Sequence, residues 1–311
     1  MGILLVGDFD ERERAGWLQA LDAALPGERW HLDRAEAGAD EAEIAVVANP
    51  PAGSLRGLAR LRLIQSLWAG VDKLLRDPTV PGEVPLARMV DPAMNTAMAE
   101  TALWAVLHLH RDHDRYTAQQ RERQWLAHPQ RRADEVHVAV LGLGEMGRAT
   151  ALRLQANGYR VTGWRRSAGQ EEGLSVTHGR EGLTALLGQA DIVVNLLPLT
   201  PETQGLFDAR TLGTMRRGAS LVNLARGAHV VEADLLSALD AGHLRHAVLD
   251  VFRDEPLPEA HPFWTHPRVT VRPHVAAQTD PRSAAEVVAR NVRALREGRP
   301  LAHLVDRVAG Y

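Results

Sequence analysis

Short apolar segments alternate with longer amphipathic ones along the chain, and this alternation predicts a protein built from parallel strands and helices. In the first hundred residues, the apolar runs at 3–6, 44–48 and 63–66 are typical of buried strands. A helix-like segment at 11–24 separates the first two runs. Strands that alternate with helices favour a parallel α/β layer.

The same alternation is clearer from residue 137 onward. Helix-like segments separate apolar runs at 137–141, 160–164, 192–196, 220–223, 246–250 and 269–271. Six strands in this arrangement predict a doubly wound parallel sheet. The expected fold class is therefore α/β, with two doubly wound parallel sheets in two domains.

Two helix-like segments connect the predicted domains. The segment 95–114 is long enough to carry the chain out of the first domain, and 283–296 is expected to return to it. We therefore expect a split domain formed by 1–98 and 284–311, with a domain 99–283 inserted into it. The polar stretch around Trp125, just after the long helix, is either a solvated arm or a surface that packs on a second subunit.

Composition narrows the class of protein. The 311 residues carry a formal net charge of −3, so no broad basic face is expected for nucleic acid or an acidic membrane. The chain has no cysteine, which excludes disulfides, thiolate metal sites and cysteine nucleophiles, and no metal site is predicted. The apolar runs are shorter than the roughly 20 residues that cross a membrane. The first run meets Gly7 and Asp8, as a strand does and a signal peptide does not, so a soluble cytoplasmic protein is expected.

A glycine-rich turn follows the first strand of the second domain. Gly142, Gly144 and Gly147 form a GxGxxG pattern, with Glu145 and Met146 between the last two, and a helix-like segment follows. Such glycines permit a tight turn, a close approach of the backbone to a pyrophosphate, and close packing of helix on strand. The helix N-terminus then offers amide donors to the phosphates. The pattern predicts a dinucleotide-binding domain.

The end of the next strand indicates which dinucleotide is bound. NAD-binding proteins commonly place Asp or Glu there to accept hydrogen bonds from the adenosine ribose. This chain has Trp164, Arg165, Arg166 and Ser167 instead. Guanidinium groups can make bidentate, charge-assisted hydrogen bonds to the extra phosphate of NADP, which a carboxylate would repel. We therefore expect NADP(H) to be preferred over NAD(H).

Three residue types suited to reduction of a 2-oxo acid follow successive strands. Arg226 follows the strand at 220–223 and could hold a carboxylate and a carbonyl. Glu255 and His274 follow the next two strands, and a carboxylate beside the histidine would stabilise the imidazolium that donates a proton. Strand ends in an open α/β sheet face the ligand crevice, so the three are expected to act together.

These segments resemble the D-isomer-specific 2-hydroxyacid dehydrogenases. The resemblance rests on LGLGEMG, NLLPLTPET, NLARGAHVVEADLL, LDVFRDEPLP and RPHVAAQT. It covers nearly the whole second domain and extends more faintly into the first. The segments SLWAGVDKL and WRRS and the short chain are most similar to the glyoxylate and hydroxypyruvate reductase A branch. The resemblance implies two Rossmann-like domains, a small 2-oxo or 2-hydroxy acid as substrate, and a homodimer.

The resemblance also implies roles for individual residues. Arg226 would bind the substrate carboxylate and carbonyl, and His274, paired with Glu255, would be the acid/base and contact the substrate. Further cofactor contacts would come from Leu197, Pro198, Ala225 and Asp250, the last of which would meet the nicotinamide carboxamide.

In the first domain, the resemblance assigns the loop at Trp68, Ala69 and Gly70 to substrate binding. The amides of Ala69 and Gly70 would hold the carboxylate. Trp68 would crowd the pocket and favour small acids, although a packing role for the ring is an equal alternative. Met94 and Met98 either line the pocket or belong to the core, the more usual place for methionines at helical spacing.

Other functions stay open at this point. Within the same fold, formate and phosphite dehydrogenases are rivals, but formate oxidation needs no proton relay. Larger 2-oxo acids such as phenylpyruvate are alternative substrates. A nucleotide-sensing scaffold without catalysis is a third possibility, which the presence of all three catalytic residue types disfavours.

Overall fold

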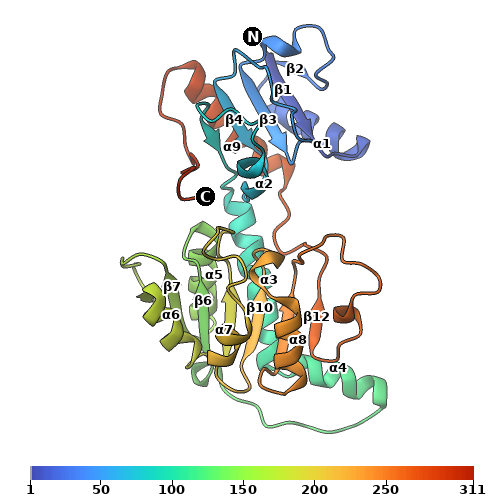
Figure 1. Cartoon of the computed structure of the whole chain (residues 1–311), viewed down its shortest axis with the longest axis vertical. Coiled ribbons are helices and arrows are strands. Elements are labelled where there is room, and N and C mark those ends of the chain that lie inside the picture. The colour runs from blue at the N-terminus through green and yellow to red at the C-terminus, as the bar shows by residue number, and fades with distance from the viewer. Residues whose placement is uncertain (1) are drawn as a thin grey trace. The chain divides into compact units, whose positions relative to one another are not determined.

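The computed structural model describes residues 2–311, which form two compact units (Figure 1). The first unit contains the chain up to Met94 and the segment Thr279–Tyr311. The second unit is Asn95–Gln278. The chain therefore leaves the first unit after Met94 and re-enters it at Thr279, whereas the sequence predicted these changes after residues 98 and 283.

The first unit is built on a five-stranded parallel sheet. Its strands are β1 (Gly2–Gly7), β2 (Arg29–His31), β3 (Ile44–Ala48), β4 (Leu63–Ser66) and β5 (Leu86–Ala87), in the order β2-β1-β3-β4-β5. The three longer strands are those that the apolar pattern predicts. The pattern misses β2 and β5 because these edge strands are only three and two residues long.

Helices cover the sheet of the first unit. They are α1 (Glu11–Ala24), α2 (Asp72–Arg76) and α9 (Pro281–Arg296), with a short 3₁₀ helix at Ala39–Glu41. Asp10 caps α1 by accepting from the amide of Glu13, and α1 packs against α9. Arg296 at the end of α9 forms ion pairs with Glu28 and Glu43, which fixes the returning helix to the first part of the chain.

The second unit is built on a seven-stranded parallel sheet. Its strands are β6 (His137–Leu141), β7 (Arg160–Arg165), β8 (Ser175–His178), β9 (Ile192–Asn195), β10 (Ser220–Asn223), β11 (His246–Leu249) and β12 (Val269–Val271), in the order β12-β11-β10-β9-β6-β7-β8. The six predicted strands are present. The pattern misses β8, an edge strand with no buried residue.

The helices of the second unit are α3 (Pro92–His110), which begins in the first unit, α4 (His113–Glu122), α5 (Glu145–Ala156), α6 (Gly179–Leu187), α7 (Ala209–Thr214) and α8 (Glu232–Asp240), with 3₁₀ helices at Ala133–Glu135, Gly227–His229 and Pro262–Trp264. The prediction of one helix over 95–114 was wrong at its end. Asp112 adopts a left-handed conformation with φ 55°, which ends α3 and starts α4 in a new direction.

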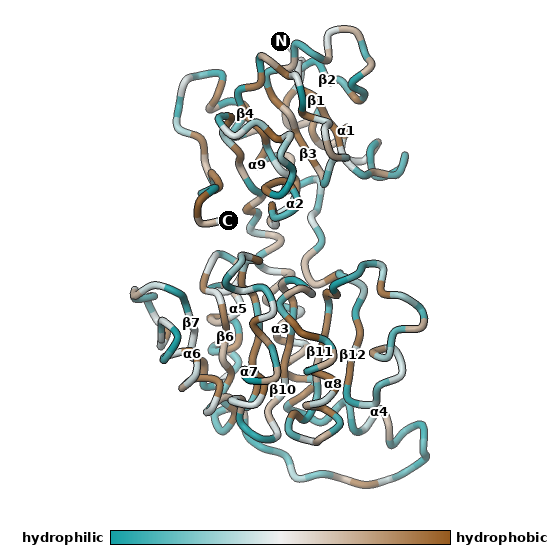
Figure 2. The backbone as a smooth tube through the Cα atoms, in the orientation of Figure 1, coloured by the Kyte–Doolittle hydropathy of each residue, from teal (hydrophilic) through white to brown (hydrophobic). Residues whose placement is uncertain are grey.

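Both faces of the second sheet are buried, and alternate strand residues belong to different cores. One core contains Ala139, Leu141, Val193 and Leu221, and the other contains Val138, Val140, Ile192, Val194 and Val222. Figure 2 shows strands such as β10, β11 and β12 as apolar segments between more hydrophilic loops. A parallel sheet with both faces covered produces the continuous apolar runs that made these strands predictable. No helix within residues 2–311 combines the length and hydropathy needed to cross a bilayer.

Candidate active site

Five loops of the second unit lie along one edge of its sheet. The register pairs Leu141 with Asn195, Asn195 with Asn223, Asn223 with Leu249, and Leu249 with Val271. The strands β6, β9, β10, β11 and β12 therefore end at the same level. The loops that follow them contain the predicted catalytic residues and the predicted cofactor residues other than 164–167, which lie at the end of β7. This is the carboxyl edge, where α/β sheets bind ligands.

The three positions of the turn after β6 require or allow glycine for different physical reasons. Gly142 adopts φ 93°, and a Cβ there would lie 2.8 Å from the carbonyl oxygen of Leu196. A Cβ on Gly147 would overlap the carbonyl of Gly142, so this glycine lets α5 pack on β6. Gly144 has an ordinary φ of −71°, and a Cβ there would meet nothing within 4 Å. Its missing side chain serves no contact of the fold and leaves the backbone open to a ligand.

The N-terminus of α5 presents amide donors beside this opening. Gly144 is the N-cap residue and, having no side chain, caps none of the first amides. Glu145 is exposed and Met146 is half-buried in the first turn. Helix N-termini with uncapped amides bind phosphate well because the N–H groups and the helix dipole both favour negative charge. The turn therefore fits the pyrophosphate of a dinucleotide.

The residues at the end of β7 are divided between the core and the surface. Trp164 is buried in the core, and its indole N–H donates to the carbonyl oxygen of Gly179 at 2.8 Å. Arg166 and Ser167 are exposed. Arg165 forms an ion pair with Glu171, Nη1 to Oε1, at 3.2 Å. Glu171 was not predictable from the sequence, because it belongs to the next segment of the chain and reaches the arginine only in the folded structure.

Glu255 and His274 form a close pair. The Nδ1 of His274 lies 2.8 Å from Oε2 of Glu255, and the other carboxylate oxygen of Glu255 accepts from the amide of Phe252 at 2.9 Å. Burial tends to raise the pKa of Glu255, but the hydrogen bonds from His274 and Phe252 and the charges of His274 and Arg226 outweigh it and lower this pKa. Glu255 is therefore ionised at neutral pH, and only Nε2 of His274 is left to act on a ligand.

The backbone around His274 is held in an uncommon conformation. His274 has φ 53°, and its amide donates to the carbonyl oxygen of Asp250 at 2.8 Å. The carboxylate of Asp250, which is buried, accepts from the amides of Val275 and Ala276, both at 2.9 Å. Burial raises the pKa of Asp250. Asp250 thus fixes the loop that carries His274, and the predicted contact with nicotinamide stays a prediction.

Arg226 is half-buried in the loop that follows β10. Its Nη1 donates to the carbonyl oxygen of Ala225 at 2.7 Å, and its own carbonyl accepts from Nδ2 of Asn223 at 2.9 Å. A Cβ on Gly227 would overlap the backbone of Phe252, so glycine there lets the Arg226 segment lie against the segment that leads to Glu255. The structure thus brings Arg226, Glu255 and His274 to one edge.

In the first unit, the loop after β4 has two amides without a protein acceptor. The amides of Ala69 and Gly70 donate to no acceptor within residues 2–311. Trp68 is fixed on both sides, because its amide donates to Oγ of Ser66 and its ring packs edge-on against Trp17 with the centroids 6.1 Å apart. The ring therefore has a packing role, while the amides of the next two residues are available to an anion.

Both methionines that sequence analysis left open are buried. Met94 is 5% and Met98 is 6% exposed. Met98 belongs to a core of the second unit, and the Sδ of Met94 accepts from the hydroxyl of Thr279 at 3.3 Å. Packing explains both residues.

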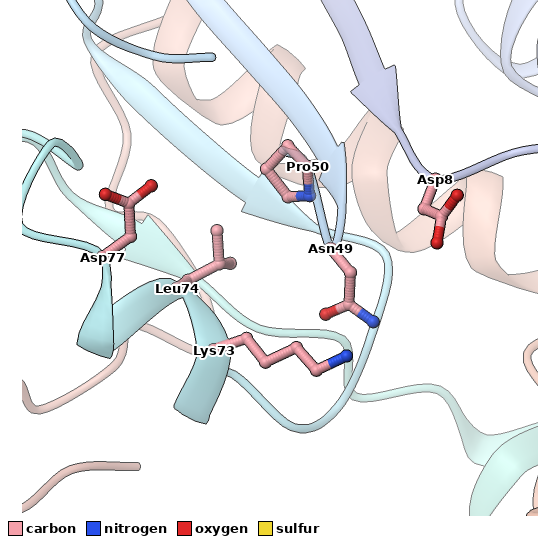
Figure 3. A pocket seen from close by; sticks show the side chains of 6 residues that line it. All are labelled: Asp8, Asn49, Pro50, Lys73, Leu74 and Asp77. Carbon is pink, nitrogen blue, oxygen red and sulfur yellow. The ribbon is translucent and has the colours of Figure 1, made fainter. Parts of the chain in front are cut away.

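Two cavities lie near the loops described above, one in each unit. In the first unit, a cavity of about 90 Å³ opens beside the only lysine of the chain, Lys73, whose side chain extends toward Asn49 (Figure 3). Asp8 and Asp77 also line it, so its two carboxylates outweigh the one ammonium group. It is therefore a poor site for an anionic substrate.

The second cavity, of about 410 Å³, lies in the second unit between α3 and the loop of His274. Asp250, Val275, Trp104 and Arg272 line it, and the guanidinium of Arg272 lies 4.3 Å from the centre of the Trp104 ring. Trp104 and Arg272 were not predictable from the sequence, because neither belongs to the motifs that follow the strands.

Comparison with known proteins identifies the family. The model of the D-isomer specific 2-hydroxyacid dehydrogenase NAD binding domain matches residues 103–276, which is more than half of the chain. The chain belongs to this family. The family that the five motifs indicated is confirmed, as is the α/β fold with two parallel sheets.

Relatives of this dehydrogenase are similar over their full length. The glyoxylate/hydroxypyruvate reductase A of Serratia proteamaculans is 40% identical over 317 residues, which cover 100% of both chains. The crystal structure of a D-isomer specific 2-hydroxyacid dehydrogenase from Xanthobacter autotrophicus Py2, in complex with NADPH and MES, superimposes with a TM-score of 0.95 at 40% identity, over 100% of this chain and 99% of that one. The NADPH-dependent glyoxylate/hydroxypyruvate reductase of Sinorhizobium meliloti, in complex with NADP and sulfate, gives 0.91 at 36% identity, with coverage of 100% and 99%.

Proposed function

We propose that this chain reduces small 2-oxo acids, glyoxylate and hydroxypyruvate, to 2-hydroxy acids with NADPH as the preferred reductant. The observation that carries the proposal is the pair of His274 and Glu255, at 2.8 Å, on the same sheet edge as Arg226 and the glycine turn. A binding protein has no need of an ionised carboxylate that orients a histidine. The names of the relatives support the same activity.

The residues of the second unit fit NADP(H). The turn at Gly142, Gly144 and Gly147, with the amides of Glu145 and Met146, would hold the pyrophosphate. Arg165, Arg166 and Ser167 would meet the phosphate on the adenosine ribose, while the backbone at Trp164 shapes the end of the strand. The nicotinamide end would lie against the remaining predicted cofactor residues Leu197, Pro198, Ala225 and Asp250. When bound, NADPH supplies a hydride.

The chain's own residues supply binding and the proton. Arg226 would bind the carboxylate and the carbonyl oxygen of the substrate through its planar fork. Nε2–H of the His274 imidazolium would donate to that carbonyl oxygen, which becomes the hydroxyl as the carbonyl carbon is reduced. Glu255 holds Nδ1–H and stabilises the positive charge until the proton leaves. His274 is half exposed, so it can take its next proton from water.

Substrate binding by the first unit is part of the same proposal. The free amides of Ala69 and Gly70 would bind a carboxylate, and Trp68 would limit the size of the acid. Larger acids such as phenylpyruvate are the alternative to glyoxylate and hydroxypyruvate. Assays of hydroxypyruvate and phenylpyruvate, with the wild type and with Trp68→Ala, distinguish small from large acids as substrates.

The test of the activity is absorbance at 340 nm with NADPH or NADH and each 2-oxo acid. Turnover of glyoxylate and hydroxypyruvate is expected, and His274→Ala should abolish it while binding of NADPH persists. No oxidation with any acid would refute the proposal.

Arg165→Ala combined with Arg166→Ala should weaken the binding of NADPH much more than that of NADH. Equal losses would refute the cofactor preference.

We further propose a cytoplasmic homodimer. Trp125 and Leu126 follow α4 and are 103% and 59% exposed, which is unusual for large apolar side chains outside an interface. Helix α4 is fixed to the rest of the second unit through Asp114, which forms an ion pair with Arg245 at 2.6 Å. Sedimentation of the wild type and of a Trp125→Ser, Leu126→Ser variant tests the proposal, because the variant should dissociate at a concentration where the wild type stays dimeric.

A further inference from the structure

A fully buried polar network lies beneath the catalytic edge of the second sheet. Asn195 ends β9, Asn223 ends β10, and His229 closes the 3₁₀ helix that follows Arg226; all three are 0% exposed. Nδ2 of Asn195 donates to Oδ1 of Asn223 at 3.0 Å and to Nδ1 of His229 at 2.9 Å. None of these side chains was singled out by the sequence patterns.

These contacts define the proton position on His229. Both hydrogens of an amide nitrogen are donors, so Nδ1 of His229 must be the acceptor in its contact with Asn195. The hydrogen of the neutral ring is then on Nε2, which lies 3.2 Å from the carbonyl oxygen of Pro198 and donates to it. The ring therefore accepts at one end and donates at the other.

The network connects two loops with different proposed tasks. On one side it holds the loop after β9, because His229 donates to the carbonyl of Pro198 and the amide of Leu197 donates to Oδ1 of Asn195 at 3.3 Å. On the other side it holds the loop after β10, because Nδ2 of Asn223 donates to the carbonyl of Arg226 at 2.9 Å. The first loop is a proposed cofactor contact, and the second carries the proposed carboxylate ligand.

We propose that His229 is a positioning residue that couples the cofactor loop at Leu197 and Pro198 to Arg226. The inference rests on the proposed function for the tasks of the two loops. His229 touches neither substrate nor cofactor in this proposal and acts through Pro198 and Asn195. Because buried polar groups are costly to leave without partners, the network favours one relative placement of the two loops.

The backbone near His229 does not depend on its side chain. The carbonyl of His229 accepts from the amide of Phe207 at 2.9 Å, and the carbonyl of Phe207 accepts from the amide of Val231 at 3.1 Å. The carbonyl of Pro198 also accepts from the hydroxyl of Thr203 at 2.7 Å. Substitution of His229 is therefore expected to loosen the placement of the loops rather than to unfold them.

Two conservative substitutions separate the two ends of the ring. His229→Asn can keep an acceptor for Asn195 but cannot reach Pro198, so it should weaken NADPH binding, measured as the dissociation constant by fluorescence titration, by about fivefold. His229→Gln can reach Pro198 but loses the acceptor near Asn195, so it should raise the KM for the 2-oxo acid by about fivefold with little change in NADPH affinity. His229→Leu should show both losses.

The matched control is His137→Gln. His137 is also buried in this sheet, at the opposite, amino end of β6, where its Nε2 lies 2.9 Å from Oγ1 of Thr162. This variant should leave both constants unchanged even if its melting temperature falls. If His229→Asn and His229→Gln lower only the melting temperature, or each raises both constants equally, His229 is a packing residue and the inference is wrong.

The binding measurement separates this inference from the proposed function. If the wild type reduces none of the 2-oxo acids, the proposed function fails on its own. The NADPH dissociation constants of His229→Asn and His229→Gln still test the coupling to Pro198, because they require no turnover. Equal NADPH affinities in these two variants overturn the inference whatever the activity.

Discussion

Acid should destabilise the second unit through one buried histidine. His246 opens β11 and is 3% exposed, with Nε2 at 2.9 Å from Oγ1 of Thr270 and Nδ1 at 3.5 Å from Asp114. Burial lowers the pKa of His246 from 6.5 to about 4. The carboxylate of Asp114 opposes this shift, and the neighbouring cationic or titratable groups of Arg245, His108 and His266 add to it.

The direction of the effect follows from the lowered pKa. The unfolded chain binds a proton at this histidine below pH 6.5, whereas the folded chain does so only near pH 4. The contribution of neutral His246 to the free energy of unfolding is therefore fully present above pH 6.5, and it is lost as the pH falls from 6.5 toward 4. From these two pKa values, His246 alone reduces the free energy of unfolding by about 2 kcal/mol at pH 5 compared with pH 7.5.

Urea unfolding at pH 7.5 and pH 5 measures this contribution. His246→Gln keeps a polar group near Thr270 but cannot titrate, so its loss of stability between the two pH values should be about 2 kcal/mol smaller than that of the wild type. His178→Gln, at an exposed histidine of β8, is the control and should lose as much as the wild type. The pKa of His108 is also lowered by burial, so some acid sensitivity should persist in His246→Gln. An equal loss in His246→Gln and wild type would refute the reasoning.

Four substitutions test the site itself. Gly144→Ala should fold with an unchanged melting temperature but bind NADPH at least about tenfold more weakly, whereas Gly147→Ala should lose stability in thermal unfolding because its Cβ overlaps the backbone of Gly142. Arg226→Lys should lower kcat/KM about 100-fold in the 340 nm assay, since an ammonium group cannot replace the planar fork. Glu255→Gln should lower kcat by about 100-fold or more without weakening NADPH, and normal turnover would exclude its proposed role in stabilising the imidazolium.

The fold was predictable where burial dominates the sequence. The strands β6, β9, β10 and β11 are buried throughout, and each has an apolar run that polar residues interrupt only at the strand ends. The missed strand β8 has exposed and half-buried residues that give no such run. The break between α3 and α4 was also missed, because the left-handed Asp112 lies in a segment whose residues otherwise continue the helical pattern.

The candidate site was predictable for the residues in the loops that follow successive strands. Arg226, Glu255 and His274 were expected together because parallel strands end on one edge, and the structure brings them together. The network of His229 was not predictable. Both partners of the His229 ring lie in the segment 195–198, 34 and 31 residues away along the chain, so these contacts leave no pattern in the sequence.

The charge at the end of β7 shows why a motif alone does not decide cofactor preference. The sequence has two arginines there, but the structure pairs Arg165 with Glu171 in a contact where the arginine side chain is 37% and the glutamate 20% exposed. Ion pairs in such exposed positions contribute on the order of 0–1 kcal/mol, because water and salt screen them. A phosphate carries more charge than a carboxylate and can accept two parallel hydrogen bonds from one guanidinium. Exchange of Glu171 for the NADP phosphate therefore costs little, so the ion pair does not oppose the proposed preference for NADPH.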